Sequence, residues 1–159
     1  TMLPEQIHLV IVGRHTEYTD KIERFIKENK LEERVHIISN VPFDDLPAFY
    51  QLAEIFVYPS RFEGFGIPII EALYSDIPVV AATGSCLEEA GGPDSIYVHP
   101  DDIKGMANAF KQIYSDTERK KEMIEKGQKF AKRFSEEKQA EEILNIYKKL
   151  MKWTYLNIQ

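Results

Sequence analysis

The sequence contains very little cysteine: a single residue, Cys86, among 159. One thiol excludes a disulfide within the chain and is typical of a reducing compartment. No apolar run approaches 18 residues, so no transmembrane helix is predicted. The first five residues have neither the basic segment nor the apolar stretch of a signal peptide. These absences favour a cytoplasmic protein.

The sequence also lacks an excess of basic residues and the usual metal-binding patterns. It has 20 basic and 26 acidic residues, a net charge of −6, which argues against a nucleic-acid partner. The four histidines are not spaced like metal ligands, and no Asp-x-Asp pair ends a predicted strand. The two Asp-Asp pairs, Asp44–Asp45 and Asp101–Asp102, are interpreted as helix caps. No metal cofactor is therefore expected.

Short β-rich runs alternate with helical patterns over the first hundred residues. The predicted strands are Ile7–Val12, Val35–Ile38, Ile55–Tyr58, Pro78–Ala82 and Ile96–Val98. This alternation predicts an α/β fold, with a Rossmann-like parallel sheet of about five strands and helices on both faces. The first run is continuously apolar, which suits a strand buried on both faces. Residues 101–159 are expected to form the helical C-terminal part of the same single domain.

Ligands of such sheets bind at the carboxyl ends of the strands. Four turns fall at such ends and could together form one crevice. They contain Gly13, Ser39–Val41, Ser60–Gly66 and Thr83–Cys86.

The third of these turns leads into a helix and is bracketed by two carboxylates, Glu63 and Glu71. Glycines precede the helix, and Pro68 opens it. A helix N-terminus of this kind binds anions through its free N–H groups and its dipole, here the N–H groups from Gly66 to Ile70, except that of Pro68. Carboxylates are instead suited to hydroxyl groups. A ligand that has both phosphates and hydroxyl groups is a nucleotide sugar.

Two other positions are less specific. Gly13-Arg14 follows the first predicted strand but lacks the G-x-G-x-x-G pattern, so Arg14 is as readily an exposed side chain as a diphosphate ligand. The missing glycine pattern also disfavours a dinucleotide-dependent dehydrogenase. Cys86 has no neighbouring base in the sequence and is interpreted as a small packing residue.

The segments Ser60–Leu73 and Ile77–Ala81 closely resemble the signature of the retaining GT-B glycosyltransferases of family four, also called group one. The resemblance covers nearly the whole chain. It extends to Leu9–Gly13, Leu46–Ser60, Leu87–Glu89, Tyr97–Asp101 and Lys129–Tyr147.

The resemblance implies a role for each matching residue. Glu63 would be the catalytic residue, which faces the donor sugar hydroxyls and supports the developing positive charge. Glu71 would bind the ribose. The remaining donor-binding residues would be Gly13, Arg14, Val41, Gly64, Phe65, Gly66 and Ile67, with the base near Val41 and the sugar and diphosphate on the backbone of the last four. The family needs no metal.

The chain departs from the family in three ways. Asp76 stands where the family usually has glycine, and Arg14 stands in place of a second glycine after Gly13. The family's N-terminal acceptor-binding domain and a first βα unit with a diphosphate-binding arginine and lysine are not in this sequence. We therefore expect residues 1–159 to be a nucleotide-sugar-binding domain from a longer two-domain enzyme, inactive by itself. In the full-length protein, the missing domain would mediate any association with the inner face of the membrane.

Two alternatives remain open at the level of sequence. The chain could be a non-catalytic subunit that binds nucleotide sugar and acts with a separate acceptor-binding chain. It could also be a GT-B relative with other chemistry, such as a sugar-nucleotide epimerase or a phosphorylase, although a phosphorylase needs a lysine for pyridoxal phosphate and no such setting is evident.

Overall fold

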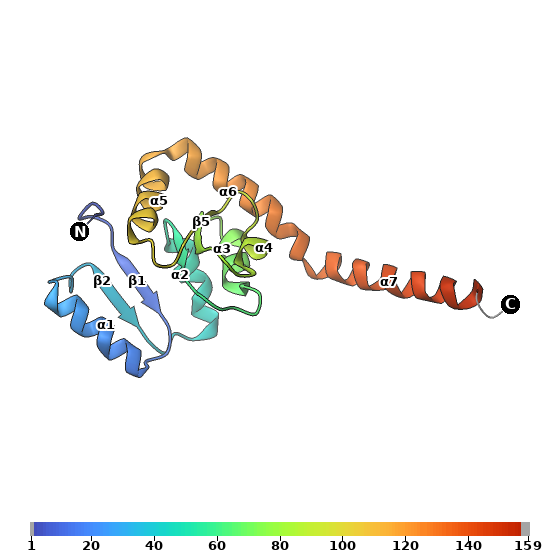
Figure 1. Ribbon diagram of the computed structural model, residues 1–159, viewed down its shortest axis with the longest axis horizontal. Helices are drawn as coiled ribbons and strands as arrows, with labels where there is room; N and C mark the ends of the chain where they lie inside the picture. Colours follow the sequence, from blue (N-terminus) through green and yellow to red (C-terminus); the bar gives the residue numbers. More distant parts are fainter. Residues whose placement is uncertain (1, 157–159) are drawn as a thin grey trace. The chain divides into compact units, whose positions relative to one another are not determined.

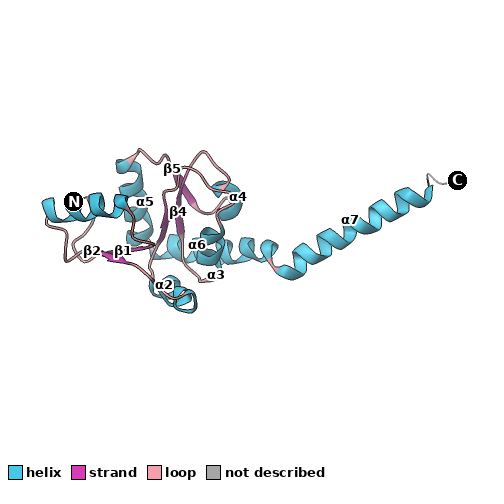
Figure 2. Ribbon diagram, turned by 90° about the horizontal axis from the view of Figure 1, so that it is seen from below, coloured by secondary structure: helices cyan, strands magenta, loops and turns pink. Residues whose placement is uncertain are grey.

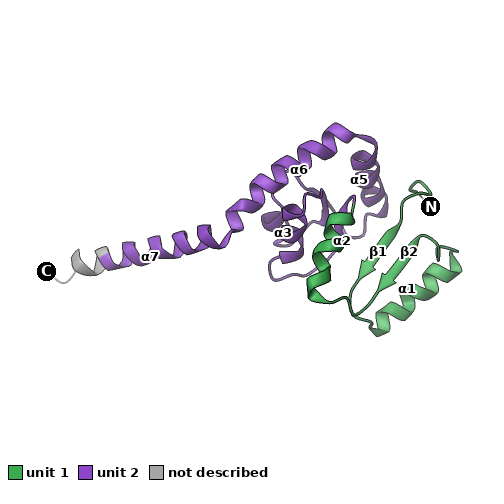
Figure 3. Ribbon diagram, turned by 180° about the vertical axis from the view of Figure 1, so that it is seen from behind, with its two compact units in different colours: residues 1–53 green, residues 54–159 purple. Residues whose placement is uncertain are grey.

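A computed structural model describes the backbone of residues 2–156 and the side chains as far as residue 151. The chain divides into two compact units, residues 1–53 and 54–159 (Figure 3). Helices and strands alternate as far as β5, and only helices follow it (Figure 1; Figure 2).

The first unit contains a pair of parallel strands. Its elements are β1 (Leu9–Val12), α1 (Glu17–Glu28), β2 (Val35–Ile38), a 3-10 helix η1 (Phe43–Asp45) and α2 (Leu46–Leu52). Leu9 pairs with Val35 at one end of the ladder, and Val12 pairs with Ile38 at the other. Both carboxyl ends therefore lie at the same edge of this sheet.

The expectation that β1 is buried on both faces is wrong. Leu9, Val10 and Val12 are 46%, 47% and 39% exposed. Burying both faces of a strand requires a neighbouring layer on each side. Among its described residues this unit has only two strands and three helices, so the apolar run stays half-exposed in spite of its composition.

The second unit contains the larger sheet. Its elements are β3 (Phe56–Tyr58), α3 (Ile67–Tyr74), β4 (Val79–Ala82), α4 (Leu87–Gly91), β5 (Ile96–Val98), α5 (Ile103–Ser115), α6 (Thr117–Ala131), a 3-10 helix η2 (Lys132–Phe134) and α7 (Glu136–Leu156). The strands are parallel in the order β3-β4-β5.

The central strand of this sheet is the most deeply buried element. All four residues of β4 have no exposed surface. Val80 belongs to a core cluster with Val98 of β5, Ile113 of α5 and Met123 of α6. Val79 and Ala81 alternate to the opposite face, and α3 packs against β3 and β4. Helices therefore cover both faces, as the apolar sequence of β4 predicts.

The predicted α/β class with parallel strands and flanking helices is confirmed. All five strands form where they were expected, distributed over a sheet of two and a sheet of three. From residue 101 to Leu156 the regular elements are all helical, and residues 157–159 lie outside the described part. No helix among the described residues is both long and apolar enough to cross a membrane.

Side-chain caps of aspartate hold the starts of α5 and α6. The carboxylate of Asp102 accepts a hydrogen bond from the Gly105 N–H at 2.8 Å, as predicted for this Asp-Asp pair. Asp116 caps α6 in the same way through the Arg119 N–H, at 2.9 Å, which the sequence reasoning did not identify. The Asp44–Asp45 pair forms no such side-chain cap.

Candidate functional site

The segment between β3 and α3 contains a left-handed turn at Gly66. Gly66 is the N-cap of α3 and has a φ of 100°, a left-handed conformation that other residues adopt at a cost. A Cβ atom at Gly66 would lie 2.9 Å from Leu87 Cδ2 of α4. At Gly64 a Cβ would meet nothing within 4 Å. Gly66 therefore sets the shape of the turn and its packing on α4, whereas Gly64 leaves open space.

Two other parts of the second unit hold Glu63. Its carboxylate Oε1 accepts a hydrogen bond of 2.8 Å from the hydroxyl of Tyr58. Tyr58 is the last residue of β3. The backbone carbonyl of Glu63 accepts a hydrogen bond from the Cys86 thiol at 3.3 Å. Cys86 is the N-cap of α4. Cys86 therefore also holds the backbone of Glu63, a role that the interpretation as a packing residue missed.

Both carboxylates of the motif act on the same phenol. The pKa of Tyr58 is raised to about 12, first by burial, then by the hydrogen bond to Glu63 and by the negative charges of Glu63 and Glu71. The negative charge of Glu63 contributes more to this rise than that of Glu71, and burial contributes most. Glu71 is the fifth residue of α3 and lies in its second turn.

The N-terminus of α3 offers fewer free N–H groups than the sequence predicts. Pro68 has none, and the Ile69 N–H donates to the carbonyl of Gly66 at 2.9 Å. The expectation of a free N–H is therefore wrong for Ile69. The N–H groups of Gly66 and Ile67 belong to the first positions of the helix, where no carbonyl of a preceding turn is available.

The ring of Phe65 anchors the turn on the C-terminal helices. It lies edge-on to Phe134 of η2, with ring centroids 5.6 Å apart. Phe134 in turn packs against Phe130 at 5.8 Å, and the guanidinium of Arg133 lies over both rings. This aromatic cluster holds the turn through the side chain of Phe65.

An ion pair ties the start of the same segment to the connection after β5. Arg61 pairs with Asp101, with Nη1 3.3 Å from Oδ2. The guanidinium lowers the pKa of the Asp101 carboxyl, chiefly by hydrogen bonding. Next to Arg61, the side chain of Phe62 is 93% exposed. The ion pair of Arg61 therefore holds the start of the segment, and the ring of Phe65 holds its end. The exposed side chain of Phe62 lies between these two contacts.

The remaining predicted site residues belong to the first unit. Gly13 follows β1, and its N–H donates to the Ile38 carbonyl at 3.2 Å. A Cβ at Gly13 would meet nothing within 4 Å, and Arg14 is exposed. Val41 follows β2 directly after Asn40, whose φ is 60°. The roles of Gly13, Arg14 and Val41 stay predictions, as does the single crevice.

The whole pattern matches a known family. The family described as glycosyl transferases group 1 matches residues 2–130. The chain belongs to this family.

Two mannosyltransferases that are similar to this chain are longer than it. O-antigen chain mannosyltransferase B of Escherichia coli is 31% identical over 142 residues, which are 89% of this chain and 37% of that protein. O-antigen chain mannosyltransferase RfbU of Salmonella typhimurium is 35% identical over 109 residues, 69% of this chain and 31% of that protein. The chain thus spans about a third of the length of these two relatives.

Solved GT-B glycosyltransferases share the fold. Sucrose-phosphate synthase from Thermosynechococcus elongatus superposes with a TM-score of 0.79 at 26% identity, over 91% of this chain and 38% of that chain. HepE from Anabaena, in complex with UDP, superposes with a TM-score of 0.84 at 23% identity, over 92% of this chain and 42% of that chain. Because HepE is only 23% identical to this chain, its similarity shows a shared fold and no more.

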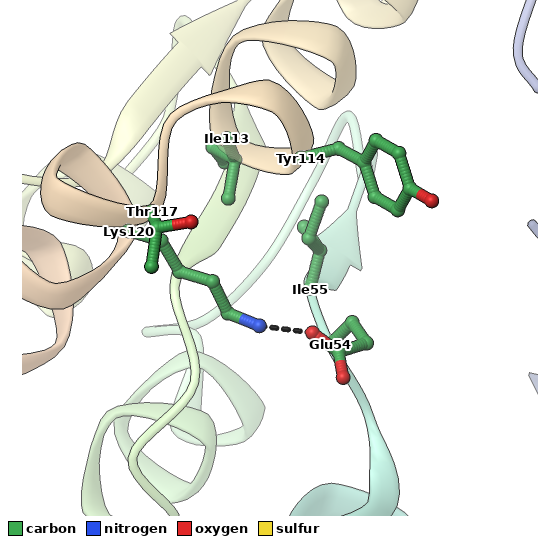
Figure 4. Close-up of a pocket in the computed structure, with 6 residues that line it drawn as sticks. All are labelled: Glu54, Ile55, Ile113, Tyr114, Thr117 and Lys120. Atoms are coloured by element: carbon green, nitrogen blue, oxygen red, sulfur yellow. Dashed lines mark hydrogen bonds and ion pairs between the residues drawn. The ribbon is translucent and has the colours of Figure 1, made fainter.

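Two hollows of the group 1 glycosyltransferase chain lie away from the motif. One of about 180 Å³ is lined by Ile55, Ile113, Tyr114 and Thr117 and by the ion pair of Glu54 with Lys120 (Figure 4). Glu54 and Ile55 directly precede β3, so this hollow lies at the amino edge of the sheet, opposite the ligand-binding edge. The other, of about 420 Å³, lies between α4 and the end of α6, and neither is lined by Glu63 or Glu71.

One cluster of possible metal ligands was missed at the level of sequence. His15 Nε2 lies 3.5 Å from an Asp20 carboxylate oxygen and 3.9 Å from one of Glu23. Asp20 and Glu23 are three residues apart on α1, which is the spacing that would have revealed the cluster. All three side chains are more than half exposed. Exposed ion pairs of this kind occur on helices without any metal.

Proposed function

We propose that this chain is the donor-binding domain of a retaining glycosyltransferase, which transfers a sugar from a nucleotide-diphosphate sugar to a sugar or lipid acceptor. The observation that carries the proposal is the turn between β3 and α3: Glu63 accepts a hydrogen bond from Tyr58 at the carboxyl end of β3, and Glu71 lies in the second turn of α3, which this turn opens. Hydroxyl-binding carboxylates beside an anion-binding helix end suit a nucleotide sugar.

The donor lies along the motif in a defined order. Glu63 binds the sugar hydroxyls and stabilises the positive charge that develops as the bond to the diphosphate breaks. The backbone of Gly64, Phe65, Gly66 and Ile67 holds the sugar and diphosphate, and Glu71 binds the ribose. In the first unit, Gly13 and Arg14 contribute to diphosphate binding and the main chain near Val41 meets the base. HepE, whose fold is similar, binds UDP, which supports a nucleotide donor.

Catalysis in this proposal needs no metal. The N-terminus of α3 has a partial positive charge that favours the leaving diphosphate. Acceptor binding belongs to a region outside these 159 residues, as does any association with the inner face of the cytoplasmic membrane. The chain by itself binds donor weakly and does not transfer sugar.

Titration calorimetry of the chain with UDP, UDP-glucose, GDP and GDP-mannose tests the ribose assignment. Hydrogen bonds to a charged group contribute about 1.5–3 kcal/mol each, so Glu71→Ala should weaken binding roughly 10-fold or more. Glu118→Ala is the matched control, because Glu118 is an exposed glutamate in the first turn of α6. If Glu71→Ala left the nucleotide affinity unchanged, the assignment of Glu71 as the ribose ligand would be wrong.

Glu63 is tested in a protein that also supplies the acceptor-binding part. Removing one charge-stabilising group from an active site lowers kcat by about 100-fold or more, and Glu63→Ala should do the same. Normal transfer by Glu63→Ala would contradict its catalytic role.

A further inference from the structure

Tyr58 contacts the proposed catalytic carboxylate directly. Its hydroxyl lies 2.8 Å from Oε1 of Glu63, whereas Oε2 forms no hydrogen bond with the part of the chain that the structure describes. We propose that Tyr58 is a positioning residue, whose hydroxyl holds Oε1 of Glu63 so that Oε2 is presented to the donor sugar. This inference rests on the proposed function of Glu63.

The carboxylate needs such a partner because of where it lies. Glu63 is in the irregular segment between β3 and α3, next to the almost fully exposed Phe62. A glutamate side chain loses rotamer entropy when it is held in one conformation. A hydrogen bond already present before the donor binds offsets this loss, and catalysis depends on groups held in productive geometry.

Tyr58 is itself well placed to act as the fixed partner. It is the last residue of β3, and its neighbour β4 is completely buried. Its ring stacks on Phe56, with centroids 5.8 Å apart and planes inclined by 18°. The Tyr58 hydroxyl therefore belongs to a residue of the sheet, whereas Glu63 lies in the irregular segment. The strand end therefore gives the carboxylate of Glu63 a partner in regular structure.

The backbone of Glu63 is fixed independently. The Cys86 thiol donates to its carbonyl from the N-cap of α4. Side chain and backbone of Glu63 are thus held from two different elements. Removing the Tyr58 hydroxyl should free the carboxylate while the backbone contact persists.

The direction of the hydrogen bond is set by protonation. An ionised carboxylate only accepts hydrogen bonds, so the hydrogen belongs to Tyr58. Burial and the charges of Glu63 and Glu71 raise the pKa of Tyr58 to about 12. The phenol therefore remains a neutral donor across the physiological pH range.

Tyr58→Phe removes the hydroxyl and keeps the ring, which separates positioning from packing. The variant chain is titrated by calorimetry with UDP, UDP-glucose, GDP and GDP-mannose. Because Glu63 faces the sugar, affinity for the sugar nucleotide that binds should fall roughly 3- to 10-fold, with affinity for the matching diphosphate unchanged. Tyr74→Phe is the control, because Tyr74 is 47% exposed at the end of α3. Equal losses for diphosphate and sugar nucleotide, or no loss for either, would overturn the proposal.

Glu63→Ala and the double variant distinguish this inference from the proposed function. If Tyr58 acts through Glu63, adding Tyr58→Phe to Glu63→Ala should produce no further loss. If Glu63→Ala weakens sugar-nucleotide binding but Tyr58→Phe does not, only the role of Tyr58 fails. If Glu63→Ala has no effect, or no nucleotide binds at all, the proposed function fails and this inference fails with it.

A ligand-free measurement tests the contact itself. Titration of the Tyr58 ring carbon by NMR should give a pKa of about 12 in the unmodified chain. In Glu63→Gln the pKa should move toward the ordinary value of 10.0, because a charge and a charged acceptor are removed. A pKa that does not move would show that the hydrogen bond is absent and would overturn the proposal.

Discussion

Asp76 has a left-handed backbone conformation, with a φ of 59°, directly after the C-cap of α3. Glycine reaches this conformation without the steric penalty that a Cβ atom imposes. The family that this chain resembles usually has glycine at this position, and the observed φ gives the physical reason. Aspartate is among the few other residues that tolerate it.

Asp76→Gly should raise the free energy of unfolding by about 0.5–1 kcal/mol, because the steric strain is relieved and is only partly offset by the greater entropy of glycine in the unfolded chain. Urea denaturation monitored by circular dichroism measures the change. Asp76→Ala keeps a Cβ without the local polar side chain and should be destabilised instead. A less stable Asp76→Gly variant would mean that the aspartate side chain contributes more than its strain costs.

Single residues also mark where sequence reasoning stopped. The sequence predicts a packing role for Cys86 and a role of the backbone alone for Phe65. Each contacts a residue that is distant along the chain: Cys86 the carbonyl of Glu63, and Phe65 the ring of Phe134. No local pattern of residue types encodes such pairs, because they depend on how the elements pack.

At the level of elements, the turn into α3 is built against α4. Gly66 has a φ of 100°, and its missing Cβ allows Leu87 to approach. Leu87 has no exposed surface, so it has little room to move. The helix that would bind the diphosphate is therefore positioned by contacts with the next helix.

Gly66→Ala should lower the free energy of unfolding by about 2–3 kcal/mol, because it adds left-handed strain to a clash with a buried side chain. Gly64→Ala is the matched control, since a Cβ there meets nothing within 4 Å, and its effect should stay within about 0.5 kcal/mol. Urea denaturation of both variants gives the comparison. Similar effects of the two substitutions would contradict the packing of the turn on α4.

At the scale of the whole molecule, donor binding should stabilise the fold without a metal. A ligand that binds only the folded state at 100 times its dissociation constant adds about 2.7 kcal/mol to the free energy of unfolding. The melting temperature should therefore rise with the nucleotide sugar that binds in calorimetry, and by the same amount in the presence of EDTA. If EDTA abolished the rise in melting temperature, a metal would take part in donor binding. Glu71→Ala should reduce the rise in melting temperature both with and without EDTA.

The sequence by itself determined the class of fold, the order of the elements and the motif. Short apolar runs bounded by glycine and proline predict strands because their signal is local, and all five form at the predicted places. The Asp102 cap was predictable for the same reason, since the contact spans three residues. The family signature is equally a matter of consecutive residues, and it placed Glu63 and Glu71 on either side of a glycine turn.

Only the tertiary structure decided how these parts are held. It showed that β1 is half-exposed and β4 fully buried, although both runs are apolar, because burial depends on the layers that surround a strand. It also brought the Tyr58 hydroxyl and the Cys86 thiol to Glu63. Contacts between elements arise from packing in three dimensions, which the spacing of residues along the chain does not express.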